Sequence, residues 1–175
     1  MAKVLFIIAK NGFRDEELLI PAEILSQAGH QIFIASNTEA GNFAYGAGGS
    51  KVKVDLNLNE VNPSDYDLVV FVGGPGALDN LNNEVSYQIA RKAVLKKLAA
   101  ICIAPTILAL AGVLKGKKAT VWSSSQYKES INILKENGAE YQEKSVVVDG
   151  NIITANGPAA AKEFGEKLKE ILMEE

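Results

Sequence analysis

The stretch LAAICIAPTILALAG, residues 98–112, changes its pattern halfway. Residues 98–103 form a short apolar run of strand length, and residues 105–114 open with a proline, which is favoured in the first turn of a helix. A strand that passes directly into a helix, with Cys102 at the join, is the layout of a nucleophile elbow, the sharp turn that exposes a reactive side chain above a sheet. The stretch therefore predicts an α/β fold and makes Cys102 the first candidate nucleophile.

Strands and helices alternate along the rest of the chain as well. The predicted strands are residues 4–9, 31–36, 67–72, 98–103 and 119–123. The predicted helices are residues 15–28, 82–97, 105–114, 125–138 and 159–175. A hairpin is predicted at 145–155 with its turn at Asp149-Gly150, and a short strand or hairpin within 37–66. In the helix at 82–97 the residues expected to face the core include Val85, Ile89, Ala93 and Leu95. Because the strands are apolar on both faces, we expect one domain, residues 1–175, with a doubly wound, flavodoxin-like fold: a mostly parallel sheet with helices on both faces.

The composition is that of an ordinary globular domain, with 47% hydrophobic and 22% charged residues among 175. A net charge of −3 argues against binding to nucleic acid or to an anionic membrane surface. The apolar runs are far shorter than the ~20 residues that span a bilayer, and the start of the chain reads as a strand rather than a signal peptide. We therefore expect a cytoplasmic protein without a nucleic-acid or membrane partner.

The chain has one cysteine, Cys102, and one histidine, His30. This excludes an intramolecular disulfide and a zinc site built from cysteine and histidine, and no metal is expected. His30 comes directly before the strand at 31–36, so it is expected at the edge of the sheet away from Cys102. It is a weak candidate for catalysis.

Functional sites of parallel α/β sheets lie beyond the carboxyl ends of the strands. The segments that follow predicted strands are Asn11–Glu17, Gly73–Gly76, Cys102–Thr106, Trp122–Ser124 and Asn156–Pro158. At this edge, amide N–H groups and the dipole of the following helix would lower the pKa of the Cys102 thiol from about 8.5. The alternative is that Cys102 is only a small buried hydrophobic residue.

Residues 99–120, AAICIAPTILALAGVLKGKKAT, resemble the signature of the ThiJ/PfpI family, within the class I glutamine amidotransferase-like superfamily. This family includes protein deglycases and PfpI-type intracellular proteases. Three more segments resemble family motifs in the same order: GFRDEELLIP at 12–21, DLVVFVGGPGALDNL at 67–81 and VVVDGNIITANGPAAAKEFG at 146–165. The resemblance covers nearly the whole chain.

The resemblance implies a role for each matching residue. Cys102 would be the nucleophile, and Glu17 would be a protonated carboxyl group that hydrogen-bonds the thiolate and relays protons; taken by itself, Glu17 could be an exposed acid in a first helical turn. The backbone N–H groups of Gly74 and Ile103 would form the oxyanion hole. The substrate pocket would be lined by Gly73, Pro75, Trp122, Asn156, Gly157 and Pro158. The family implies a homodimer without metal or organic cofactor.

Two residues of this chain differ from the family pattern and reduce the number of functions to expect. PfpI-type proteases carry a histidine directly after the cysteine, and this chain has Ile103 there. Many relatives have an arginine where this chain has Asn156, so weaker anion binding by the pocket is expected. What remains resembles the deglycase branch, in which a Cys–Glu pair acts on small dicarbonyls.

Three functions follow from these observations. The first is a cysteine-dependent, cofactor-free enzyme in which Cys102 attacks a small reactive carbonyl, such as methylglyoxal or glyoxal, or a glycated adduct. The second is an oxidative-stress sensor with a chaperone-like role, in which Cys102 is oxidised. The third is a PfpI-type hydrolase or peptidase completed by a partner chain, which the missing histidine disfavours.

Overall fold

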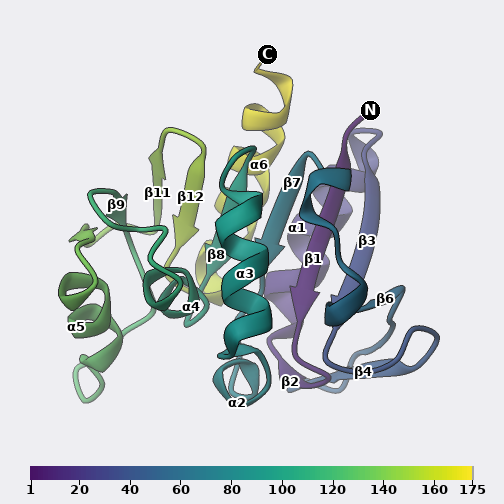
Figure 1. Ribbon diagram of the computed structural model, residues 1–175, viewed down its shortest axis with the longest axis horizontal. Helices are drawn as coiled ribbons and strands as arrows, with labels where there is room; N and C mark the ends of the chain where they lie inside the picture. Colours follow the sequence, from purple (N-terminus) through teal and green to yellow (C-terminus); the bar gives the residue numbers. More distant parts are fainter. Residues whose placement is uncertain (175) are drawn as a thin grey trace.

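The computed structural model describes residues 1–174 and contains a seven-stranded sheet with the order β11-β12-β8-β7-β1-β3-β6 (Figure 1). Its strands are β1 (Lys3–Ile8), β3 (Gln31–Ser36), β6 (Leu56–Asn57), β7 (Leu68–Phe71), β8 (Leu98–Ile101), β11 (Val146–Asp149) and β12 (Ile152–Ala155). Neighbouring strands are parallel except in the β11–β12 hairpin, which is antiparallel. The mostly parallel sheet expected from the sequence is confirmed.

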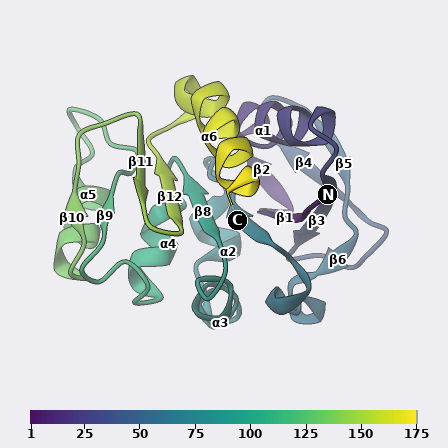
Figure 2. The same ribbon diagram turned by 90° about the horizontal axis from the view of Figure 1, so that it is seen from above.

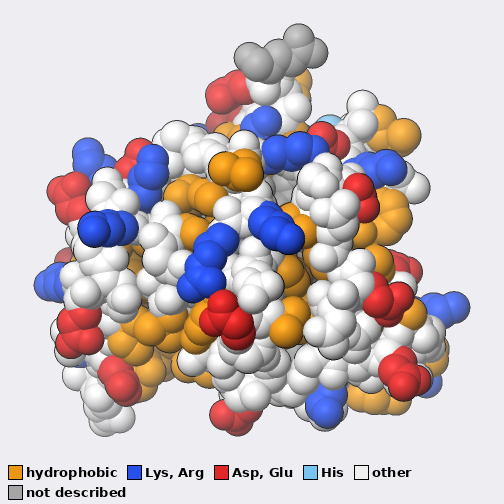
Figure 3. Space-filling model, in the orientation of Figure 1, with side chains coloured by type: hydrophobic (Ala, Val, Ile, Leu, Met, Phe, Trp, Pro, Cys, Tyr) orange, Lys and Arg blue, Asp and Glu red, His pale blue; other side chains and the backbone are white. Residues whose placement is uncertain are grey.

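Helices cover both faces of this sheet. Figure 2 shows α1 (Asp15–Gln27) and α6 (Ala161–Met173) on one face, and α3 (Glu84–Ala93) and α4 (Pro105–Leu110) on the other. The remaining helices are α2 (Ala77–Leu81), α5 (Glu129–Glu136) and the 3₁₀ turns η1 (Leu58–Glu60), η2 (Pro63–Asp65) and η3 (Pro158–Ala160). In residues 1–174 no helix is both long enough and apolar enough to cross a membrane. Figure 3 shows charged side chains of both signs interspersed over the face that carries α3.

The central strand β1 explains the two-layer core. Val4, Phe6 and Ile8 are buried on the side of α1 and α6, and Leu5 and Ile7 are buried on the side of α3 and α4. Successive side chains of a strand point to opposite faces, so an unbroken apolar run is what a strand covered on both sides requires.

Two small sheets complete the fold. The hairpin expected within residues 37–66 is present as β4 (Phe43–Gly46) and β5 (Lys51–Lys53), but it pairs with β2 (Asn11–Phe13) rather than with the main sheet. The buried carboxylate of Asp15 accepts hydrogen bonds from the amides of Gly48 and Ser50, which fastens the hairpin to the start of α1. The other small sheet joins β9 (Lys118–Ala119) to β10 (Glu140–Tyr141).

Several predicted boundaries are wrong. The strand expected at 119–123 stops at Ala119, because beyond it the Thr120 amide bonds the side chain of Thr154 instead of a strand ladder. The helix expected at 82–97 ends at Ala93, so Leu95 is 84% exposed, and Val85 is also exposed. The other predicted helices are shorter than expected at one or both ends, and Glu175, the last residue of the helix expected at 159–175, lies outside the described residues.

The order of the strands indicates where along the sheet a ligand would bind. From β1 the chain moves outward to β3 and β6 and then returns to β7 on the other side of β1. In doubly wound sheets, ligands bind beyond the carboxyl ends of the strands at this point of reversal. Figure 1 shows β1 and β7 side by side, with their arrowheads at the edge where β2 and α2 lie.

Candidate active site

Cys102 follows β8 and stands in a strained backbone conformation. Its φ of 65° makes it the one non-glycine residue among 1–174 with a positive φ. Its N–H donates to the carbonyl of Ala155 (2.9 Å), and its own carbonyl accepts from the N–H of Trp122 (2.7 Å). These two hydrogen bonds keep Cys102 in its strained backbone conformation. A non-glycine residue kept in the left-handed region is a frequent mark of a functional site.

Gly73, at the end of the neighbouring strand β7, lies directly against Cys102. A Cβ atom at Gly73 would come within 2.8 Å of Cys102 Cβ, 2.8 Å of the Ile101 carbonyl oxygen and 2.9 Å of Glu17 Oε1. Because a side chain at position 73 would overlap all three, glycine is required there for space. The same three distances show that the Glu17 carboxyl and the Cys102 side chain meet at this point.

Glu17 enters the site from the first turn of α1 and is completely buried. Its Oε1 accepts a hydrogen bond from the Gly73 N–H (3.1 Å), whereas its Oε2 is buried without a partner among residues 1–174. Burial raises the pKa of Glu17 to about 7, although the neighbouring Cys102 thiol, the Gly73 N–H and the Arg14 charge lower it. Glu17 is therefore a carboxyl group that can hold or release a proton near neutral pH.

The thiol of Cys102 differs from its sequence-based expectation. Its pKa is raised, first by burial and then by the negative charge of Glu17. The Ile103 N–H and the charge of Arg14 act in the opposite direction but are weaker, and α4 has only six residues. The expectation that amides and a helix dipole would depress this pKa is wrong. A thiolate is favoured only while Glu17 keeps its proton.

The candidate oxyanion hole consists of the backbone N–H groups of Gly74 and Ile103, which lie in the turns next to the Cys102 thiol. Gly74 has a φ of 121°, and a Cβ there would come within 2.4 Å of the Arg14 nitrogen, so glycine is needed for both conformation and space. Across residues 1–174, the N–H group of Gly74 has no acceptor within the protein, and that of Ile103 is directed to the Cys102 thiol. Both residues line the cavity that contains Cys102. Amide N–H groups beside a nucleophile are the donors that a developing oxyanion requires.

The cavity above Cys102 has a volume of about 420 Å³. It is lined by Arg14, Gly74, Pro75, Leu78, Asp79, Cys102, Ile103, Trp122, Tyr127 and Pro158. Of the residues predicted for the site, Glu17 and Gly73 lie beside Cys102 rather than on the cavity wall. Asn156 is exposed and does not line the cavity, and neither does the buried Gly157, which packs near the Trp122 ring.

Four lining residues were missed by the sequence analysis: Arg14, Leu78, Asp79 and Tyr127. Arg14, Leu78 and Asp79 lie within the segments at 12–21 and 67–81 that resemble family motifs, but nothing in their local sequence singles them out. Tyr127 also had no signal in the sequence, because its ring reaches the cavity by packing on Trp122, with ring centroids 5.5 Å apart.

His30 is far from this chemistry. It lies in the turn between α1 and β3, and its Nδ1 accepts a hydrogen bond from the Ala2 N–H (3.1 Å). Ala2 precedes β1, so His30 stands at the opposite edge of the sheet from Cys102. This is the position expected from its place in the sequence.

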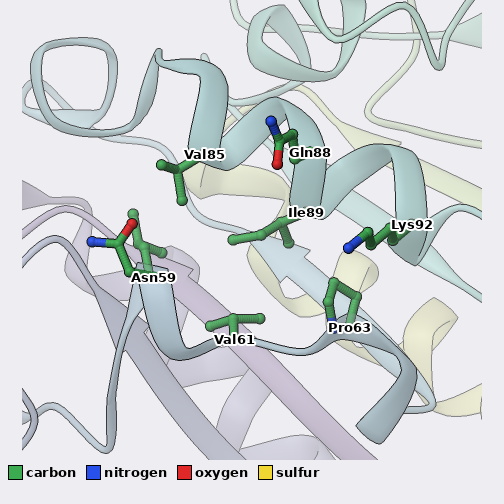
Figure 4. A pocket seen from close by; sticks show the side chains of 8 residues that line it. Asn59, Val61, Pro63, Val85, Gln88, Ile89 and Lys92 are labelled. Atoms are coloured by element: carbon green, nitrogen blue, oxygen red, sulfur yellow. The ribbon is translucent and has the colours of Figure 1, made fainter.

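A second pocket, of about 230 Å³, lies between α3 and the segment that carries η1 and η2 (Figure 4). Its lining residues are Leu58, Asn59, Val61, Pro63, Val85, Gln88, Ile89 and Lys92. None of these side chains is an acid, a thiol or a histidine. We therefore assign the chemistry to the cavity above Cys102.

Comparison with known proteins identifies the family of the chain. Residues 2–171 match the model of the DJ-1/PfpI family. The chain is 40% identical to deglycase PfpI of Pyrococcus furiosus over 95% of this chain and 99% of that protein, and 31% identical to the putative cysteine protease YraA of Bacillus subtilis over 98% and 99%. The crystal structure of a ThiJ/PfpI domain protein from Brachyspira murdochii superposes with a TM-score of 0.89, at 29% identity, over 98% of this chain and 96% of that one.

Proposed function

We propose, starting from the fact that the chain belongs to the DJ-1/PfpI family, that it is a cysteine-dependent enzyme acting on small reactive carbonyls or glycated adducts. The observation that carries this proposal is the strained Cys102, which lies at the cavity beside a buried carboxyl group whose pKa is about 7. Such a pair supplies a nucleophile and a proton relay in one contact. The function needs no cofactor.

With methylglyoxal as the substrate, the first step is addition of the Cys102 sulfur to the aldehyde carbon. The sulfur reacts as the thiolate while Glu17 holds the proton, and Glu17 then gives this proton to the carbonyl oxygen, which leaves a hemithioacetal and the Glu17 carboxylate. The N–H groups of Gly74 and Ile103, which line the same cavity, would hydrogen-bond the oxygen as its negative charge develops. No redox partner is required for this step.

The second step is an internal redox reaction. Glu17 as a carboxylate removes the hydrogen of the former aldehyde carbon as a proton, and the electron pair forms an enediol with the neighbouring ketone carbon. Return of the proton to that ketone carbon leaves a thioester on Cys102. Water then hydrolyses the thioester and releases lactate and the thiol, so that methylglyoxal plus water balances lactate plus one proton.

The test is the formation of lactate from methylglyoxal by purified protein, with Cys102→Ala as the control. We expect lactate from the wild type and none above background from Cys102→Ala. Release of the unmodified amine from a glycated model peptide is the second assay. Equal product from both proteins in both assays would refute the proposal.

Of the other two functions, the peptidase is the weaker on this geometry. Peptide hydrolysis by a cysteine nucleophile lacks its histidine general base here. Ile103 follows Cys102, and His30 lies at the opposite edge of the sheet. Oxidation of Cys102 to a sulfinic acid would use the same thiolate as carbonyl addition, and a titration with peroxide followed by intact mass tests this sensor function. The homodimer and the cytoplasmic location expected from the sequence belong to the same proposal, and light scattering and cell fractionation test them.

A further inference from the structure

The cavity holds a cation that the proposed mechanism does not use. Arg14 lines it together with Cys102 and Ile103. The Arg14 N–H donates to the Gly73 carbonyl (3.0 Å), so its backbone is fastened to the same turn that touches the thiol. Its positive charge is close enough to lower the pKa of both Glu17 and Cys102. The Arg14 backbone is thus held at the turn that touches the thiol, and its charge acts on the reacting sulfur.

The guanidinium of Arg14 has no protein anion as a partner. Its Nε is buried and has no acceptor within residues 1–174, and none of the ion pairs in that part of the chain includes it. Asp79 also lines the cavity, but it is exposed and not within ion-pair distance. A buried N–H without an acceptor is unfavourable, and a guanidinium binds carboxylates through parallel hydrogen bonds. The unsatisfied donor therefore points to an anionic group on the ligand.

The size and walls of the cavity agree with a ligand longer than methylglyoxal. About 420 Å³ lies within the range of about 300–1,000 Å³ found for pockets that hold sizeable organic ligands. Leu78, Trp122 and Tyr127 supply apolar wall. A short methylene chain could lie against them, with a carbonyl at Cys102 and a carboxylate at Arg14.

Resting on the function proposed above, we propose that Arg14 selects α-oxoaldehydes that carry a carboxylate. A suitable probe is 4,5-dioxopentanoate. Cys102 adds to its aldehyde, the aldehyde carbon is oxidised and the ketone carbon reduced as for methylglyoxal, and one water is consumed to give 2-hydroxyglutarate and a proton. Arg14 binds the distant carboxylate throughout. It supplies the positive charge that is missing at Asn156, which does not line the cavity.

The test compares 4,5-dioxopentanoate with its neutral methyl ester in the wild type and in Arg14→Gln. We expect kcat/KM of the wild type to favour the acid by about 10- to 100-fold, the size expected for a charge-assisted hydrogen bond, and Arg14→Gln to lose this preference. Arg91→Gln is the matched control, because Arg91 is the only other arginine and pairs with Glu84 away from the cavity. No preference in the wild type, or the same preference in Arg14→Gln, would overturn the assignment.

A binding measurement separates this inference from the proposed function. The unreactive analogue 4-oxopentanoate should protect Cys102 from iodoacetamide at a concentration at least tenfold lower than its methyl ester does, in the wild type and Arg91→Gln but not in Arg14→Gln. If methylglyoxal and both dioxo substrates are not turned over but the protection pattern holds, the proposed function fails and the carboxylate site stands. Equal protection by acid and ester overturns the carboxylate site whatever the activity.

Discussion

The coupling of Glu17 to Cys102 makes a specific prediction about the reactivity of the thiol. Glu17 loses its proton at a pH of about 7, and removal of a second proton from the pair is opposed by burial and by the charge already present. Above pH 7 the pair carries one negative charge, and the share of it on sulfur does not depend on pH. The thiolate is the reactive form, so the alkylation rate should reach a plateau above about pH 7.5.

Glu17→Gln removes the titrating carboxyl and preserves its shape. The thiol of this variant should titrate alone, with a pKa still raised by burial. Its alkylation rate should then rise about tenfold per pH unit, or about 30-fold between pH 7.5 and 9.0. Over the same interval the rate of the wild type should change less than about twofold. The two profiles differ in shape, so the comparison does not depend on absolute rates.

Iodoacetamide modification followed by intact mass is the assay, and the chain's single cysteine makes the site of modification unambiguous. Glu16→Gln is the matched control: Glu16 is the exposed neighbouring acid, and its removal should leave the plateau in place. Near-ultraviolet circular dichroism checks that both variants are folded. A wild-type rate that climbs tenfold per unit through pH 9 would refute the coupling of the two groups.

Three further outcomes follow from the same structure. Folding raises the pKa of Glu17 from 4.5 to about 7, so the folded state binds the proton more tightly than the unfolded state does. The free energy of unfolding should therefore fall by about 3 kcal/mol between pH 4.5 and 7. Unfolding titrations with guanidinium should show this decrease in the wild type and not in Glu17→Gln. Gly73→Ala should lower stability by about 1–3 kcal/mol and abolish turnover, since the new methyl overlaps the Ile101 carbonyl; normal activity would contradict the packing. Phe164→Ala, in the core under α6, should cost about 3–5 kcal/mol in thermal or chemical unfolding but keep the alkylation plateau, and a lost plateau would show that the two regions are coupled.

The sequence predicted the sheet because β7 and β8 are apolar at every position and β1 is polar only at Lys3. An unbroken run such as residues 4–9 is compatible with few environments other than a parallel sheet covered on both sides. The boundaries that failed are where local pattern and packing disagree. Leu95 continues an apolar spacing past the end of α3, and the segment after Ala119 is extended but bonds a side chain and a turn instead of a strand.

For the candidate site, the sequence placed the segments that hold Cys102, Glu17 and Gly73 at one edge, because the carboxyl ends of parallel strands lie at the same edge of a sheet. The sequence did not predict that the pKa of the Cys102 thiol is raised rather than lowered. The direction of this shift depends on burial and on the distance to a carboxyl 85 positions away in the chain, and neither is a local property. Arg14 was missed for a related reason: a lone arginine before a helix is ordinary until its Nε is found buried without an acceptor.

The features that make this site reactive also oppose folding. Cys102 occupies a left-handed conformation that costs a non-glycine residue about 1–3 kcal/mol, and burial of the Glu17 carboxyl costs about 3 kcal/mol at neutral pH. Both costs arise at the carboxyl edge of the sheet, in the turn at Cys102 and the start of α1, while the stabilising apolar contacts lie in the two layers of the core. Relief of either cost should therefore stabilise the chain and remove its chemistry together, and a Glu17→Gln protein that gained stability at pH 8 while retaining full turnover would show that the buried carboxyl has no part in the reaction.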